Sequence, residues 1–185
     1  AIRGEGVALH NLGLEREAYR EFIRATKTSA YRNSYSFWQP LVGRDMINAM
    51  VNIPRFKFRE AQKLAREGRD TCERKGDEFT FFLITESWLR CLIRRENWNR
   101  SQRIFLEETE RIPQLPYIGS LHRALLLKSG ALLAWKLNDR NSWRERVTEA
   151  LNLMVQAGLN HQIRSLKHYY GRDLDAIIDT PGSSW

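Results

Sequence analysis

Apolar residues recur every three or four positions along most of the chain, and no stretch alternates convincingly in the manner of a β-strand. Ala18, Phe22 and Ala25 form one such series, and Val147 and Ala150 belong to another. Leu, Arg, Glu and Ala are abundant and favour helices, whereas valine occurs only five times. The sequence therefore predicts an all-α fold.

Turn-forming residues interrupt this helical pattern at intervals and bound about eight or nine helices of ordinary length. The predicted breaks fall at 28–33, 52–54, 75–77, 95–97, 113–119, 138–142 and 158–160. No linker rich in Pro, Gly or Ser divides the chain, so we expect one domain. Its parts would be helical repeats at 1–160, one or two capping helices at 161–179 and a flexible tail at 180–185.

Residues 6–25 contain a small residue on one predicted helix. On the next predicted helix they contain a small residue, an aromatic residue and a second small residue at helical spacing. Gly6, Ala18, Phe22 and Ala25 occupy these places, and the segment resembles one tetratricopeptide repeat. Later segments carry parts of the same series, which are Ala61 with Ala65 and Gly68, Ser101 with Phe105, and Arg146 with Ala150. The resemblance implies a right-handed superhelix of about four antiparallel helix pairs followed by capping helices.

The four series are not spaced as in a standard tetratricopeptide repeat. Ala18, Ala61, Ser101 and Arg146 are separated by 43, 40 and 45 residues, against about 34 in the standard repeat. Longer helices and loops would hold the extra residues, as in the sensor regions of bacterial regulatory proteins that this pattern resembles. HEAT-like or other paired-helix repeats also fit such a spacing.

Basic residues exceed acidic ones by eight, and 23 of the 30 basic residues are arginines. An excess of this kind is compatible with binding to nucleic acid. However, Arg and Glu are interleaved along the chain, for example at Glu15, Arg16 and Glu17, which favours exposed ion pairs on solvated helix faces.

No constellation of catalytic or metal-ligating residues is apparent in the sequence. There is no glycine-rich phosphate loop, the four histidines are dispersed, and Cys72 and Cys91 have no histidine at a suitable helical spacing. We therefore expect buried, unreactive thiols, no metal, no cofactor and no enzymatic activity. Two cysteines and only short apolar runs favour a cytoplasmic protein that does not enter a membrane.

Aromatic and basic residues gather where the first helix pair would meet the second. Tyr31, Tyr35, Phe37, Trp38, Phe56 and Phe58 stand here among Arg32, Arg55, Lys57 and Arg59. A stacking platform for single-stranded nucleic acid is one interpretation. A second is that these rings fill the space between two helix pairs, and we favour this second interpretation.

The resemblance implies a protein–protein interaction module, in which the first helices of successive pairs line a concave surface that binds a peptide or helix. The family's inward-facing places correspond to Arg3, Val7, His10, Asn11, Met46, Met50, Glu86, Arg90, Arg94, Lys128 and Trp135. This mixture of basic and apolar side chains suits an acidic, partly hydrophobic partner. We expect the chain to belong to a larger signalling or regulatory protein, and nucleic-acid binding through a basic helical surface is the alternative.

Overall fold

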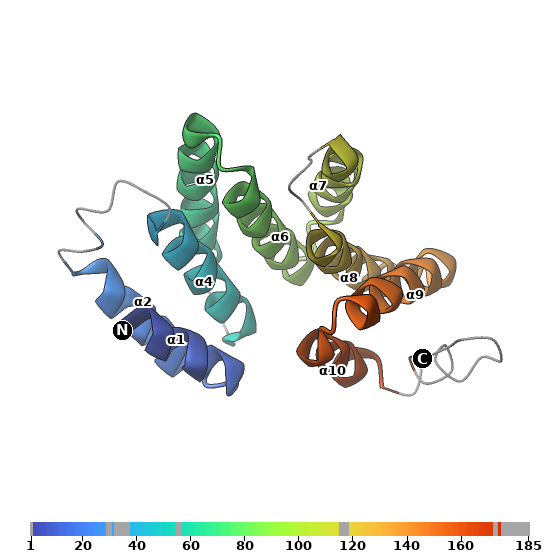
Figure 1. Ribbon diagram of the computed structural model, residues 1–185, viewed down its shortest axis with the longest axis horizontal. Helices are drawn as coiled ribbons and strands as arrows, with labels where there is room; N and C mark the ends of the chain where they lie inside the picture. The colour runs from blue at the N-terminus through green and yellow to red at the C-terminus, as the bar shows by residue number, and fades with distance from the viewer. Residues whose placement is uncertain are drawn as a thin grey trace. The chain divides into compact units, whose positions relative to one another are not determined.

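The computed structural model is built from α-helices joined by turns, and it describes residues 2–28, 31, 38–54, 57–114, 119–171 and 174 (Figure 1). Nine α-helices, one short 3-10 helix and no β-strand lie within these ranges. The predicted all-α class is thus confirmed for the described residues. None of these helices has the length and apolar character needed to cross a membrane.

The chain divides into two compact units, and the first comprises Ala1–Asn97. Its helices are α1 (Ile2–Asn11), α2 (Glu15–Thr26), α4 (Trp38–Asn52), α5 (Phe58–Lys75) and α6 (Glu78–Arg94). Helix α4 packs against α2, α5 and α6 and also meets α1 (Figure 1). Helix α4 therefore lies at the centre of the contacts within this unit.

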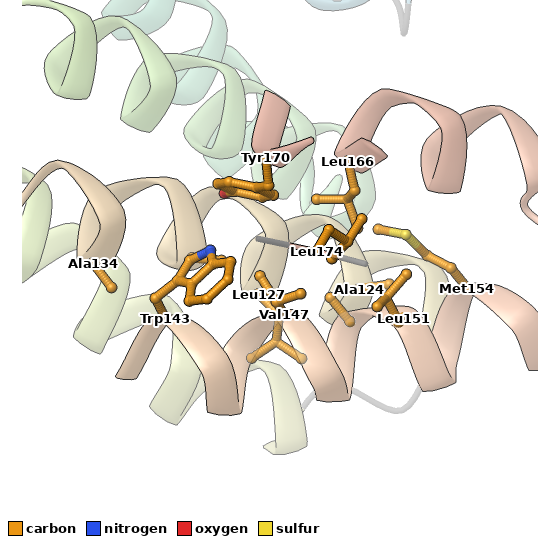
Figure 2. Packing of buried hydrophobic residues seen from close by; sticks show 12 residues of the cluster. Ala124, Leu127, Ala134, Trp143, Val147, Leu151, Met154, Leu166, Tyr170 and Leu174 are labelled. Atoms are coloured by element: carbon orange, nitrogen blue, oxygen red, sulfur yellow. The ribbon is translucent and has the colours of Figure 1, made fainter. Parts of the chain in front are cut away.

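The second unit comprises Trp98–Trp185. It contains α7 (Trp98–Arg111), the 3-10 helix η1 (Ile112–Gln114), α8 (Ser120–Lys136), α9 (Arg140–Gln156) and α10 (Asn160–Tyr170). Helices α8 and α9 make the most extensive contact, and side chains from α8, α9 and α10 share one hydrophobic core. Figure 2 shows this core, in which Trp143 and Tyr170 lie beside aliphatic side chains such as Leu127 and Val147.

One turn geometry recurs wherever the described helices are joined by a very short connection. A residue in the left-handed conformation stands in each turn, and the next residue donates its N–H to the carbonyl five positions earlier. This is the hydrogen bond of a Schellman motif, which satisfies a free carbonyl at the end of a helix. The left-handed residues are Gly13, Gly76, Glu96, Asn138 and Gly158.

Helices α2, α5, α7 and α9 share one pattern of buried positions, and α2, α7 and α9 follow a turn of this kind. The fourth residue of α2, α5, α7 and α9 is buried in every case, as is the eighth. The fourth residues are Ala18, Ala61, Ser101 and Trp143, and the eighth are Phe22, Ala65, Phe105 and Val147. The sequence pattern wrongly placed Arg146 in this series, because α9 begins at Arg140 and so brings Trp143 to that position.

Two glycines allow neighbouring helices to approach closely. A β-carbon at Gly6 on α1 would lie 2.5 Å from the ring of Phe22 on α2, which is 1% exposed. In the second unit, a β-carbon at Gly130 on α8 would lie 2.1 Å from the ring of Phe105 on α7. Because both rings are buried, neither can move aside without disturbing the core around it.

Alanine at Gly6 and alanine at Gly4 should therefore have opposite effects on stability, although both residues lie in α1. Gly6→Ala should destabilise the fold by about 1 to 3 kcal/mol, because its methyl group would overpack against Phe22. Gly4 has no atom within 4 Å of the added carbon, so Gly4→Ala should be neutral or stabilise the helix by up to about 1 kcal/mol. Urea unfolding would measure both, and equal effects would contradict this packing.

Glu96 offers a test of the turn geometry, since its φ of 58° is uncommon for a residue with a β-carbon. Glu96→Gly should raise the free energy of unfolding by about 0.5 to 1 kcal/mol, because glycine adopts this conformation without steric cost. Gly13→Ala should lower it, since the equivalent turn at Gly13 has a φ of 77°. Thermal unfolding of the two variants would check both signs.

Candidate functional site

Helices α1, α4 and α6 of the first unit, the first helices of the predicted pairs, carry a row of mainly polar side chains. We call this row the first-helix face. Helices α1, α4 and α6 end at Asn11, Asn52 and Arg94, and residues four and eight positions before these ends share one side of each helix. The face consists of Arg3, Val7 and Asn11 on α1, Arg44, Asn48 and Asn52 on α4, and Glu86, Arg90 and Arg94 on α6. It thus combines four arginines, three asparagines and one glutamate.

A buried carboxylate joins α1 to α4 beside this face. Asp45 accepts a hydrogen bond from Arg3 Nε at 2.7 Å on one oxygen and from Arg44 Nη1 at 2.9 Å on the other. The Asp45 side chain is only 5% exposed, whereas those of Arg3 and Arg44 are 30% and 27% exposed. The two half-buried guanidinium groups therefore meet at one carboxylate.

A second set of polar contacts joins α4 to α6. A terminal nitrogen of Arg90 donates to the side-chain oxygen of Asn48, and Arg90 Nε lies 3.1 Å from a carboxylate oxygen of Glu86. One turn further along, Arg94 donates to the backbone carbonyl of Ile53 at 3.0 Å. Asn48 and Glu86 are nearly inaccessible to solvent, so these contacts hold Arg90 in a defined orientation.

The end of the face near the turn between α1 and α2 has its own polar cluster. Glu15 lies between His10 and Asn52, with one carboxylate oxygen 2.6 Å from His10 Nδ1 and the other 2.8 Å from Asn52 Nδ2. Asn11, at the end of α1, is exposed. Each pair of adjacent first helices is therefore tied by at least one side-chain hydrogen bond on this side.

The structure buries three of the residues predicted to line the groove, which are Met46, Met50 and Glu86. Met46 and Met50 are 5% and 2% exposed, so their side chains do not line an open surface. The sequence pattern missed Arg44, Asn48 and Asn52, which are the residues of α4 that join the face. Counting back from the predicted break at 52–54 in steps of four would have found them.

Lys128 and Trp135, also predicted for the groove, belong to the second unit. Lys128 Nζ on α8 donates to Gln162 Oε1 on α10 at 2.8 Å. The Trp135 ring lies 5.0 Å from that of Trp143 and 5.5 Å from that of Tyr170, and the guanidinium of Arg140 stands 4.1 Å above it. Within this unit both side chains thus contact neighbouring helices.

The aromatic cluster proposed from the sequence is only partly described. Tyr35, Phe37 and Phe56 lie outside the described residues. The ring centre of Phe58 lies 5.2 Å from that of Trp88, which is 2% exposed. The guanidinium carbon of Arg95 lies over the Phe58 ring, 5.2 Å from its centre. This part of the cluster serves the core of the first unit.

Many exposed basic residues are paired with acidic ones, as the interleaved sequence suggests. Exposed or half-exposed pairs include Arg24 with Glu21, Lys57 with Glu60, Lys63 with Glu67, Arg103 with Glu107 and Arg123 with Glu149. Such pairs add little to stability, but they divide the positive charge into small, locally neutralised areas.

The described residues contain neither a metal-binding cluster nor an activated thiol. They contain no cluster of three or more His, Cys, Asp or Glu side chains able to hold a metal ion. Cys72 and Cys91 are free and buried, as expected, and burial raises the pKa of the Cys72 thiol to about 11 and that of Cys91 to about 12. Both thiols are therefore protonated at neutral pH, a poor state for nucleophilic attack.

Comparisons with models of known protein families, with curated proteins and with solved structures gave no match.

The buried His122 on α8 should make stability depend on pH. Burial lowers its pKa, and a hydrogen bond with the backbone of Gly119 offsets this only in part. The unfolded chain therefore binds a proton more readily, so this residue's contribution is present above about pH 6.5 and is lost as the pH falls below it. Urea unfolding at pH 7.5 and pH 5.5 should show a smaller difference for His122→Gln than for the wild type, and an equal difference would contradict this assignment.

Proposed function

We propose that this chain is a protein–protein interaction module built from tetratricopeptide-like helix pairs, and that its first-helix face binds a peptide or helical segment of a partner. The observation that carries the proposal is the row of arginine and asparagine side chains across α1, α4 and α6. Arg3 contacts Asp45 on α4 and Arg90 contacts Asn48 on α4, so side chains of this row link the three helices.

The recurring architecture supports the proposal of a helical repeat. The left-handed residues Gly13, Glu96 and Asn138 each follow the first helix of a proposed pair. Gly13 and Glu96 are 83 residues apart, close to two repeats, and Glu96 and Asn138 are 42 residues apart, close to one repeat. The contacts from Arg3 to Asp45 and from Arg90 to Asn48 each also span 42 residues. A period of this length fits a superhelix of paired helices.

The alternative, nucleic-acid binding through a basic surface, receives less support from the observed charges. A phosphate-binding surface concentrates unpaired Lys and Arg side chains in a patch or stripe. Here five exposed or half-exposed basic residues have an acidic partner within 4 Å. We also propose a binding role rather than a catalytic one, which requires no reactive group on the face.

A selection from a random peptide display library on the whole chain would test the proposal. We expect peptides whose binding protects amides of α1, α4 and α6 from hydrogen exchange, and whose affinity falls in the variant Val7→Glu. Val7 is half-buried on this face, so its charge would meet the bound segment. The matched control is Arg66→Gln on the exposed side of α5, which should leave affinity unchanged.

Two outcomes would contradict the proposed function. One is that no selected peptide binds in a manner sensitive to Val7→Glu, and the other is that protection appears on α2 and α5 instead. Retention of the chain on single-stranded DNA with a steep dependence on salt would favour the nucleic-acid alternative.

A further inference from the structure

We propose that α8 carries a second interaction surface, which binds an amphipathic helix of a partner together with a carboxylate near one end of that helix. The surface lies in the second unit, whereas the first-helix face lies in the first, so the inference goes beyond the proposed function. We call the surface the α8 seam. It consists of Leu121, Leu125, Lys128, Leu132 and Trp135.

Along most of α8, exposure to solvent is confined to one narrow line of side chains. From residue 124 to residue 135, the residues that are not buried are Leu125, Lys128, Leu132 and Trp135. Leu121, one turn earlier, is 37% exposed. These five residues follow one another in steps of four, three, four and three, which keeps them on one side of the helix. The protein covers the other sides of this stretch, and the seam is the side left open to a partner.

The spacing of the seam identifies a helix as its occupant. Alternating steps of four and three residues are the a and d places of a heptad, at which two helices interdigitate their side chains. Leu121, Leu125 and Leu132 supply the apolar side chains for such a contact. An apolar stripe on a partner helix would bury these leucines, whereas an extended segment has a side-chain period of two and would not match the steps.

Arg140, the first residue of α9, supplies a charge at one end of the seam. Its guanidinium carbon lies 4.1 Å from the centre of the Trp135 ring and 5.9 Å from that of Trp143. Stacking of this kind leaves the N–H groups at the edge of the guanidinium, and within the described ranges they meet neither a carboxylate nor another acceptor. A carboxylate accepts two such N–H groups side by side. Trp135 thus positions a cation for an acidic group of the partner.

The surrounding charges favour an acidic partner. Helix α8 contains no Asp or Glu, and Lys136 at its end is exposed and forms no ion pair with any described residue. Asp139 is the acidic residue between Lys136 and Arg140 in the sequence, and it accepts a hydrogen bond from the backbone N–H of Ser142. A carboxylate near the end of a bound helix would therefore complement the basic end of the seam.

A display library of amphipathic helices would test this inference on the whole chain. Each peptide has about three heptads, with apolar residues at a and d and with Glu, Gln or Lys at the other places. We expect selected peptides to bind about fivefold more weakly to Leu121→Gln. Leu121 is the most exposed leucine of the seam, so this variant should change thermal unfolding little.

A double-mutant cycle would locate the carboxylate. Each Glu of a selected peptide is replaced by Gln in turn and measured against the wild type and Arg140→Gln. One replacement, near one end of the peptide, should weaken binding to the wild type about tenfold and should have little effect on binding to Arg140→Gln. The matched control Arg164→Gln removes the same charge from an exposed place on α10 and should retain the tenfold effect.

A conservative variant separates a positioned guanidinium from charge alone. Arg140→Lys keeps the charge but lacks the planar group that stacks on Trp135, so it should lose most of the coupling. Full coupling in Arg140→Lys would overturn the positioning role of Trp135. Equal coupling of the carboxylate to Arg140 and Arg164 would overturn the assignment to Arg140.

The remaining outcomes separate the α8 seam from the proposed function. Selected helices whose binding is unchanged in Leu121→Gln would overturn the seam. If those helices instead lose affinity in Val7→Glu, they bind the first-helix face and support the proposed function alone. Displacement of the peptides by a single-stranded oligonucleotide from the wild type but not from Arg140→Gln would assign Arg140 to phosphate and overturn the choice of a protein partner.

Discussion

The left-handed turn with its hydrogen bond five residues back is the constraint on which the rest of the structure depends. It ends one helix, reverses the chain and determines the residue at which the next helix begins. A shift of one residue in that start would rotate the following helix by about 100° and would move its buried positions toward water. The close contact between Gly6 and Phe22 depends on the same phase, since a ring facing a residue with a side chain could not approach α1 so closely.

Polar contacts then determine how the first helices of the first unit lie against one another. Apolar packing favours contact but accepts several registers, whereas the bond from Arg3 to Asp45 is formed in one register only. The link from Arg90 to Asn48 plays the same part between α4 and α6. A surface intended for recognition gains from this arrangement because its charged groups are already oriented before a partner arrives.

Much of the fold could be predicted from the sequence because helix periodicity and turn residues are local signals. The helical class and the breaks at 75–77 and 95–97 agree with the observed helices. The phase of α9 was wrong because Arg146 and Ala150 are four residues apart, as are the true buried positions Trp143 and Val147. Only the observed helix start distinguishes these two series.

The candidate site was less predictable, because it depends on contacts between residues about 42 positions apart. The sequence predicted that Arg3, Arg90 and Arg94 line a groove, but it did not indicate that Arg3 would contact Asp45 or that Arg90 would contact Asn48. Met46 and Met50 were predicted to line the groove because they match the family's inward-facing places, whereas the position of α4 turns them into the core. A pattern on one helix cannot reveal which side a neighbouring helix will cover.

The shared turn geometry has a further consequence for how helix pairs are specified. It occurs within pairs, between α1 and α2 or α8 and α9, and also between successive elements such as α5 and α6 or α9 and α10. The presence of this turn therefore does not mark where one helix pair stops and the next begins. The choice of packing partner must therefore come from the side chains, such as Phe22 against Gly6 between α1 and α2, and Phe105 against Gly130 between α7 and α8.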